Sequence, residues 1–150
     1  MQIFMYRHEA FHIWVYAAVT YLLVNVLPRQ SQHKVTIVFL LSYLSYQHIS
    51  SMIRDYGGWS AEVTMYTMVL VAKLWGFSFA YKDGGMPVGE LSEYQKNNRI
   101  EKMPSVLEFL AYVSFCNGAI LGPWFEFKDF LDFMYLENHY AEMPRGLRNG

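Results

Sequence analysis

The sequence predicts an all-α protein, a multi-span transmembrane helical bundle with an interfacial amphipathic helix near its C-terminus. Three observations lead to this prediction. Apolar segments recur at lengths close to the ~20 residues that a membrane-spanning helix needs. Charged residues make up only 17% of the 150 residues, whereas soluble domains contain about 25%. Proline or glycine stands at the end of each apolar segment or shortly after it, where helices are expected to end.

Four apolar segments form the predicted bundle, covering residues 10–27, 35–53, 63–81 and 105–123. Pro28 and a polar turn close the first, so the first two segments are predicted to form an antiparallel hairpin. The fourth opens with Ser105 and Glu108 at the spacing of a capping box and ends at the helix-breaking pair Gly122-Pro123.

Two glycine pairs are predicted to end helices. Gly57-Gly58 follow the second segment, and Gly84-Gly85 follow the third. Glycine is the residue that most readily adopts the left-handed conformation of a helix C-cap. In the turn between segments two and three, Asp55 is expected to pair locally or cap a helix, and Trp59 to lie at the membrane interface.

Two further stretches lie outside the spanning segments. The connection 82–104 is polar and is predicted to be a folded surface loop. Residues 124–136 place Trp124, Phe127, Leu131 and Met134 on one helical face, with acids on another. This pattern predicts an amphipathic helix, which either lies at the bilayer interface or packs against other membrane helices.

Composition excludes several classes of function. The formal net charge is −1 and no basic run is present, so a nucleic-acid partner is not expected. Cys116 is the only cysteine, which excludes a disulfide framework or a cysteine-based metal site within these residues. His48 has no histidine or carboxylate three or four residues away, and no metal is predicted for this chain.

Ionisable residues inside apolar segments are candidates for function because they are costly in a membrane. Lys73 lies near the middle of segment three. It is either a counter-charge for an anionic substrate group or an ammonium bonded to backbone carbonyls. Glu108 is explained by its capping box, and His12 and His48 fit hydrogen-bonded interior residues.

Several patches, taken in order, resemble one known family. They are LSYL and HI at 41–44 and 48–49, DYGGWS at 55–60, KDG at 82–84, RI and PSVLE at 99–100 and 104–108, and GP, FEF and DF at 122–123, 125–127 and 129–130. Over residues 35–135 this pattern resembles the membrane-bound O-acyltransferase family, in particular its lysophospholipid acyltransferase branch. The chain departs from the family at Met65-Tyr66, where Gly-Pro is expected, and at Phe127 and Phe130, where tyrosines are expected.

The resemblance implies a multi-pass enzyme of the endoplasmic reticulum membrane that moves a fatty acyl group from acyl-CoA to a lysophospholipid. Acyl-CoA is a co-substrate, and no bound cofactor is implied. Residues 1–150 match the amino-terminal part of the family's single domain. The family's reacting histidine and its asparagine partner lie later in that domain, so no residue of this chain, His139 included, is predicted to be catalytic.

Within this framework we expect two groups of site residues. The candidates for lining a substrate tunnel or its loops are Lys73, Arg99, Ser105, Glu108 and Trp124. The residues expected to shape the backbone are Asp55, Gly57, Gly58, Trp59, Gly122 and Pro123. Two other interpretations remain open: a non-catalytic membrane scaffold or truncated isoform, and a transporter subunit that uses Lys73 and Glu108 as pathway charges.

Overall fold

The computed structural model describes residues 10–54, 63–115, 125–137 and Tyr140. Every regular element in these ranges is a helix, which confirms the all-α prediction. The elements are α2 (Ala10–Val26), α3 (Gln32–Arg54), α4 (Val63–Asp83), the 3-10 helix η2 (Val88–Glu90), α5 (Glu93–Asn98), α6 (Val106–Ser114) and α7 (Phe127–Tyr135). None of these helices is both long and apolar enough to cross a membrane, so the multi-span part of the prediction is not confirmed.

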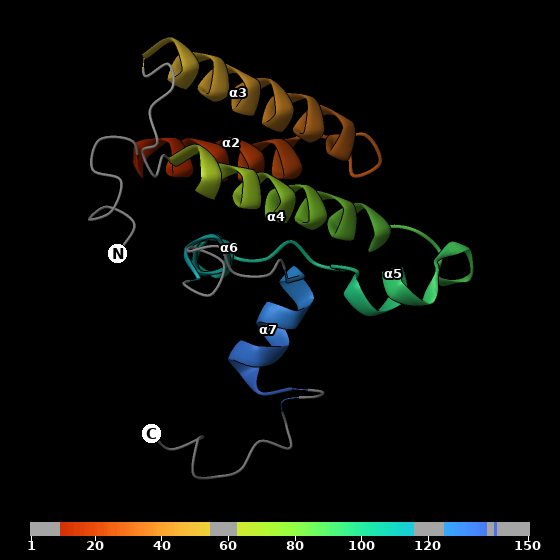
Figure 1. The fold of residues 1–150 in the computed structure, drawn as a ribbon. Helices are drawn as coiled ribbons and strands as arrows, with labels where there is room; N and C mark the ends of the chain where they lie inside the picture. Colours follow the sequence, from red (N-terminus) through yellow and green to blue (C-terminus); the bar gives the residue numbers. More distant parts are fainter. Residues whose placement is uncertain (1–9, 55–62, 116–124, 138–139, 141–150) are drawn as a thin grey trace, which may run out of the picture.

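The three long helices form the body of the fold (Figure 1). α3 packs against α2 and α4, and α2 also packs against α4. In the view of Figure 1, α3 lies above α4, whereas α5, α6 and α7 lie below it. α5 and α7 contact α4, and α6 contacts α2. Helix α4 is therefore the central element, with neighbours on both sides.

The turn between α2 and α3 lies at Pro28, where the sequence predicts it. α2 stops at Val26, and the amide of Gln32 at the start of α3 donates to the carbonyl oxygen of Pro28 at 3.0 Å. Proline cannot continue the helix because it lacks the amide proton and its ring clashes with the preceding turn. The chain therefore reverses in a short turn, and α3 returns alongside α2.

The fourth apolar segment requires a correction. A continuous helix was expected over residues 105–123, but α6 ends at Ser114. Phe115 leaves the helix with φ −60° and ψ 121°, and its amide donates to the Tyr112 carbonyl oxygen at 3.4 Å. The length of the apolar segment therefore overestimated the length of the helix. The segment contains Asn117-Gly118, a pair that favours turns and argues against one continuous helix. Residues 116–124, with Gly122 and Pro123, lie outside the described residues.

The amphipathic helix is present as α7, but its buried face differs from the predicted one. Phe127 and Phe130 are buried, whereas Met134, expected beside Phe127, is 53% exposed. The Phe127 ring packs edge-on against Phe77 of α4 and Tyr112 of α6, with centroids 5.2 and 5.1 Å apart. The first turn of α7 thus packs against other helices, which was one of the two alternatives left open.

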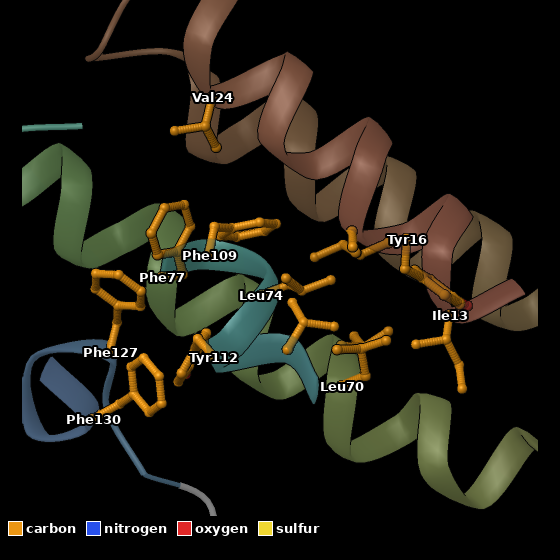
Figure 2. Close-up of a cluster of buried hydrophobic side chains, with 14 of the residues drawn as sticks. Ile13, Tyr16, Val24, Leu70, Leu74, Phe77, Phe109, Tyr112, Phe127 and Phe130 are labelled. Carbon is orange, nitrogen blue, oxygen red and sulfur yellow. The ribbon is translucent and has the colours of Figure 1, made fainter. Parts of the chain in front are cut away.

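An aromatic cluster joins the short helices to α4 (Figure 2). Its members are Phe77 from α4, Phe109 and Tyr112 from α6, and Phe127 and Phe130 from α7, all buried. Ring centroids of neighbouring members lie 4.9–6.2 Å apart, in tilted or edge-on geometry. Such pairs add stabilisation beyond the area that they bury. These rings attach α6 and α7 to α4.

Arg29, in the turn after α2, ties the 82–104 connection to the end of α4. Its Nε donates to the Tyr81 carbonyl oxygen at 2.6 Å, and its terminal nitrogen donates to the carbonyl oxygen of Ile100. The amide of Ile100 in turn donates to the Ala80 carbonyl oxygen at 2.9 Å. The predicted folded loop is therefore confirmed, and its return point lies directly against α4.

Gly84 has a different role from the one predicted. α4 does end beside the glycine pair, as predicted. Neither Gly84 nor Gly85, however, has the positive φ of a left-handed residue. A Cβ atom on Gly84 would overlap the Ile100 carbonyl oxygen and would crowd Arg29. Glycine is required here because two backbone segments approach closely, not because of a left-handed cap.

Replacing Gly84 with alanine should therefore destabilise the fold. Overpacking against backbone atoms typically costs about 1–3 kcal/mol, because neither segment can move without losing the Arg29 bonds. Gly89→Ala is the matched control, since a Cβ there meets nothing within 4 Å. Thermal unfolding in detergent compares the two variants. Equal stability of Gly84→Ala and Gly89→Ala would contradict this account.

Candidate functional site

Lys73 is buried in the core, with 2% of its surface exposed. Its Nζ donates to the Tyr112 carbonyl oxygen at 2.8 Å, and it lies 4.4 and 4.7 Å from the ring centroids of Tyr112 and Phe125. Tyr112 belongs to the last turn of α6, where carbonyl groups favour a cation. The contacts match the structural alternative for Lys73, an ammonium that joins α4 to α6.

Ser105 and Glu108 form the predicted capping box at the start of α6. The Ser105 hydroxyl accepts from the Glu108 amide at 3.3 Å, and the Ser105 amide donates to the Glu108 carboxylate at 2.8 Å. The other Glu108 oxygen accepts from the Tyr135 hydroxyl at 2.7 Å. Glu108 thus caps α6 and also connects it to α7.

An apolar cavity of about 300 Å³ lies between α4, α5 and the residue before α7. Small residues on one stripe of α4 leave the space, and aromatic side chains form its walls. From α4 the lining comprises Ala72, Trp75, Gly76, Phe79, Ala80 and Asp83, from α5 Tyr94, Gln95 and Asn98, and from the α7 N-cap Glu126. We call it the acidic aromatic cavity, because its only charged lining residues are the two acids.

Both acids of this cavity are buried. Asp83 is 6% exposed and Glu126 is 8% exposed. One Asp83 oxygen accepts from the Gln95 amide nitrogen at 3.0 Å, whereas the other has no hydrogen-bond partner among the described residues. The Tyr94 hydroxyl donates to Glu126.

The hydrogen bond between Tyr94 and Glu126 persists at physiological pH. The carboxylate stabilises the protonated phenol and, with partial burial, raises the pKa of Tyr94 to about 12. Because the folded pKa is the higher one, the stabilisation is complete below the ordinary tyrosine value of about 10 and is lost as the pH rises through about 12.

A second, cationic cavity of about 490 Å³ lies next to the first, on the other face of α5. Its lining residues are Lys96, Asn97, Arg99, Ile100, Glu101, Lys102, Lys128 and Leu131. Arg99 pairs with Glu101 at 2.6 Å and Lys128 with Asp132 at 2.6 Å, whereas Lys96 lies 3.6 Å from Glu93. Four cations against one acid in the lining suit a phosphate-bearing group.

The predicted site residues are distributed unevenly. Arg99 lines the cationic cavity, whereas Lys73, Ser105 and Glu108 line neither cavity. The other predicted site residues lie outside the described residues; they are Asp55, Gly57, Gly58, Trp59, Gly122, Pro123 and Trp124.

Sequence reasoning did not single out Asp83, Tyr94 or Glu126. The available signal was the position of Asp83 and Glu126 inside the KDG and FEF patches. Tyr94 carried no comparable signal.

The histidines that the structure describes do not form a metal site. His12 Nδ1 is within hydrogen-bond distance of the Tyr43 hydroxyl, at 2.7 Å, as an interior histidine would be. No group of three histidine, cysteine or acidic side chains among the described residues is arranged to hold a metal ion.

Comparison with known proteins identifies similar sequences. The model of the membrane-bound O-acyltransferase family matches residues 22–147. Lysophospholipid acyltransferase 5 of Drosophila melanogaster is 33% identical over 149 residues, covering 97% of this chain and 29% of the relative. Membrane-bound glycerophospholipid O-acyltransferase 2 of Gallus gallus is 28% identical over 152 residues, which cover 100% of this chain and 29% of the relative. The chain therefore spans less than a third of the length of these relatives.

If Lys73 is structural, an apolar side chain of similar volume should replace it. Lys73→Met keeps the ring contacts and removes a buried charge, an exchange that is often close to neutral, so we expect a loss below about 1.5 kcal/mol. Lys73→Ala leaves a void and should cost about 2–5 kcal/mol. Thermal unfolding in detergent measures both. If methionine destabilises as much as alanine, the ammonium bond and not the volume holds α4 to α6.

Proposed function

Because the chain belongs to the membrane-bound O-acyltransferase family, we propose that it forms part of an enzyme that transfers a fatty acyl group from acyl-CoA to a lysophospholipid. The family match over residues 22–147 is the observation that carries the proposal. The names of the relatives point to the acceptor, since they are called lysophospholipid or glycerophospholipid acyltransferases.

The chemistry requires two substrates to meet in one orientation. The acceptor hydroxyl must approach the thioester carbonyl, and a general base must take the hydroxyl proton. Both substrates carry phosphate, so we assign the cationic cavity, with Arg99, Lys96, Lys102 and Lys128, to binding a phosphate group of one of them. The base is expected from the part of the relatives' length that this chain does not span.

We further propose that α2, α3 and α4 are embedded in the endoplasmic reticulum membrane as part of a multi-pass protein. The support is the family and the apolar surface of the long helices. Leu22 and Val26 of α2 are 59% and 70% exposed, and Val38 and Ile53 of α3 are 66% and 78% exposed. Large exposed apolar patches mark surfaces that contact lipid or another protein.

Alkaline carbonate extraction tests the membrane proposal. The chain should remain with the membrane pellet, because embedded helices resist a treatment that releases peripheral proteins. A soluble protein of the lumen and a known multi-pass protein serve as the two controls. Release of the chain into the supernatant would contradict a multi-pass arrangement.

A hybrid enzyme tests the transfer proposal. In the Drosophila relative, the stretch that matches this chain is replaced by residues 1–150. The hybrid should transfer acyl groups from acyl-CoA to lysophospholipid, whereas the relative without the stretch should not. The 150-residue chain alone should stay at the uncatalysed rate, since loss of a general base typically costs ~10² to 10⁴-fold.

Two outcomes would contradict the transfer proposal. One is a hybrid that is inserted in membranes and unfolds cooperatively, yet transfers no acyl group. The other is turnover by the 150-residue chain alone, which would place the base within these residues.

A further inference from the structure

The acidic aromatic cavity contains carboxylates that lack a cationic partner. Among the described residues, neither Asp83 nor Glu126 forms an ion pair, although both are more than nine-tenths buried. A buried carboxylate is costly unless a charge or several hydrogen bonds compensate it. Asp83 has one bonded oxygen and one oxygen without a partner in the described part of the chain. No cationic side chain among the described residues therefore compensates the two acids of this cavity.

The walls of the cavity are suited to a cation with an organic body. Trp75 and Phe79 lie one turn apart on α4, with ring centroids 6.1 Å apart, and Tyr94 comes from α5. Aromatic faces attract alkylammonium groups through cation–π contacts, and tryptophan does so most strongly. A strongly hydrated metal ion would gain little from such apolar walls.

The cations nearby do not neutralise the acids. Lys82 Nζ lies 5.8 Å from the centroid of the Phe79 ring, and the His33 ring packs against the same ring in a tilted arrangement with centroids 5.1 Å apart. Neither Lys82 nor His33 is among the residues that line the cavity.

We propose that the acidic aromatic cavity binds an alkylammonium group, such as that of a choline or ethanolamine headgroup. Asp83 and Glu126 supply the negative charge, and Trp75, Phe79 and Tyr94 contact the carbon atoms around the nitrogen. Both carboxylates line the cavity, so an ammonium inside it would lie beside two negative charges.

The neighbouring cationic cavity indicates where the rest of such a headgroup lies. Gln95 and Asn98 on one face of α5 line the acidic aromatic cavity, and Lys96 and Asn97 on the other face line the cationic one. A zwitterionic headgroup carries an ammonium and a phosphate a few bonds apart, so the two cavities match its two charges. This identification of the ligand as a lysophospholipid headgroup rests on the proposed function.

Direct binding tests the site without acyl transfer. The 150-residue chain is placed in nanodiscs of phosphatidylglycerol, which lacks an ammonium group, and is titrated calorimetrically. The probes are glycerophosphocholine, free choline and glycerol 3-phosphate. Glycerophosphocholine should bind and glycerol 3-phosphate should bind more weakly by about 10-fold or more, since only the former carries the cation.

The variants connect binding to the cavity. Asp83→Asn should weaken glycerophosphocholine binding by about 10-fold, while its oxygen can still accept from Gln95. Trp75→Leu should also weaken it, through loss of the ring face. Glu90→Gln is the matched control, because it removes the same charge from an exposed residue outside the cavity, and it should bind like the parent. Thermal unfolding in the same nanodiscs verifies that each variant is folded.

The outcomes separate the possible sources and the two proposals. If free choline binds as tightly as glycerophosphocholine, the site takes a free ammonium ligand; if it binds more weakly, the phosphate contributes and a lipid headgroup is the ligand. Equal binding of glycerol 3-phosphate and glycerophosphocholine, or unchanged binding by folded Asp83→Asn, would overturn the ammonium site. Because no acyl transfer is measured, that result would leave the hybrid-enzyme experiment unaffected.

Discussion

The hydrogen bonds of Arg29 hold together three parts of the chain that are far apart in sequence. One guanidinium from the turn after α2 binds the carbonyl oxygens of Tyr81, at the end of α4, and Ile100, at the end of the 82–104 loop. Charge-assisted bonds of this kind are stronger than neutral ones. They are possible only because Gly84 has no side chain to separate the two backbone segments. The position of α5, and with it both cavities, follows from this junction.

The aromatic cluster provides the second attachment, between α4 and the short helices. α6 and α7 have nine residues each, and helices of this length are marginal in isolation. Their placement depends on Phe77, Tyr112 and Phe127 packing edge to face, and on the bond from Lys73 to Tyr112. Glu126 immediately precedes Phe127, so the ring that anchors α7 also fixes a carboxylate at the wall of the acidic aromatic cavity.

Charge is divided between the two faces of α5. Lys96, Arg99, Lys102 and Lys128 surround one cavity, whereas Asp83 and Glu126 lie in the other. A buried carboxylate with an unsatisfied oxygen does not stabilise a fold. Functional sites commonly carry this kind of cost. The separation of charge across α5 is the feature on which both binding proposals rest.

The sequence by itself determined the features that depend on neighbours along the chain. Pro28 ended the first helix, Ser105 and Glu108 formed their capping box, and three apolar segments became α2, α3 and α4. These features are local, so residue type and spacing suffice to predict them. The patches that resemble the acyltransferase family were also readable from order and spacing, and the family match over residues 22–147 agrees with them.

Tertiary structure alone decided which of these residues meet. Only the folded chain shows that Lys73 bonds a carbonyl of α6, that Gly84 makes room for Ile100, and that α6 stops at Ser114. Asp83 and Glu126 are 43 positions apart in the sequence, and no periodicity relates them. They line one cavity because Arg29 and the aromatic cluster bring α5 and α7 to the same side of α4. Contacts between distant residues depend on how helices pack, and the pattern of any single segment does not encode that packing.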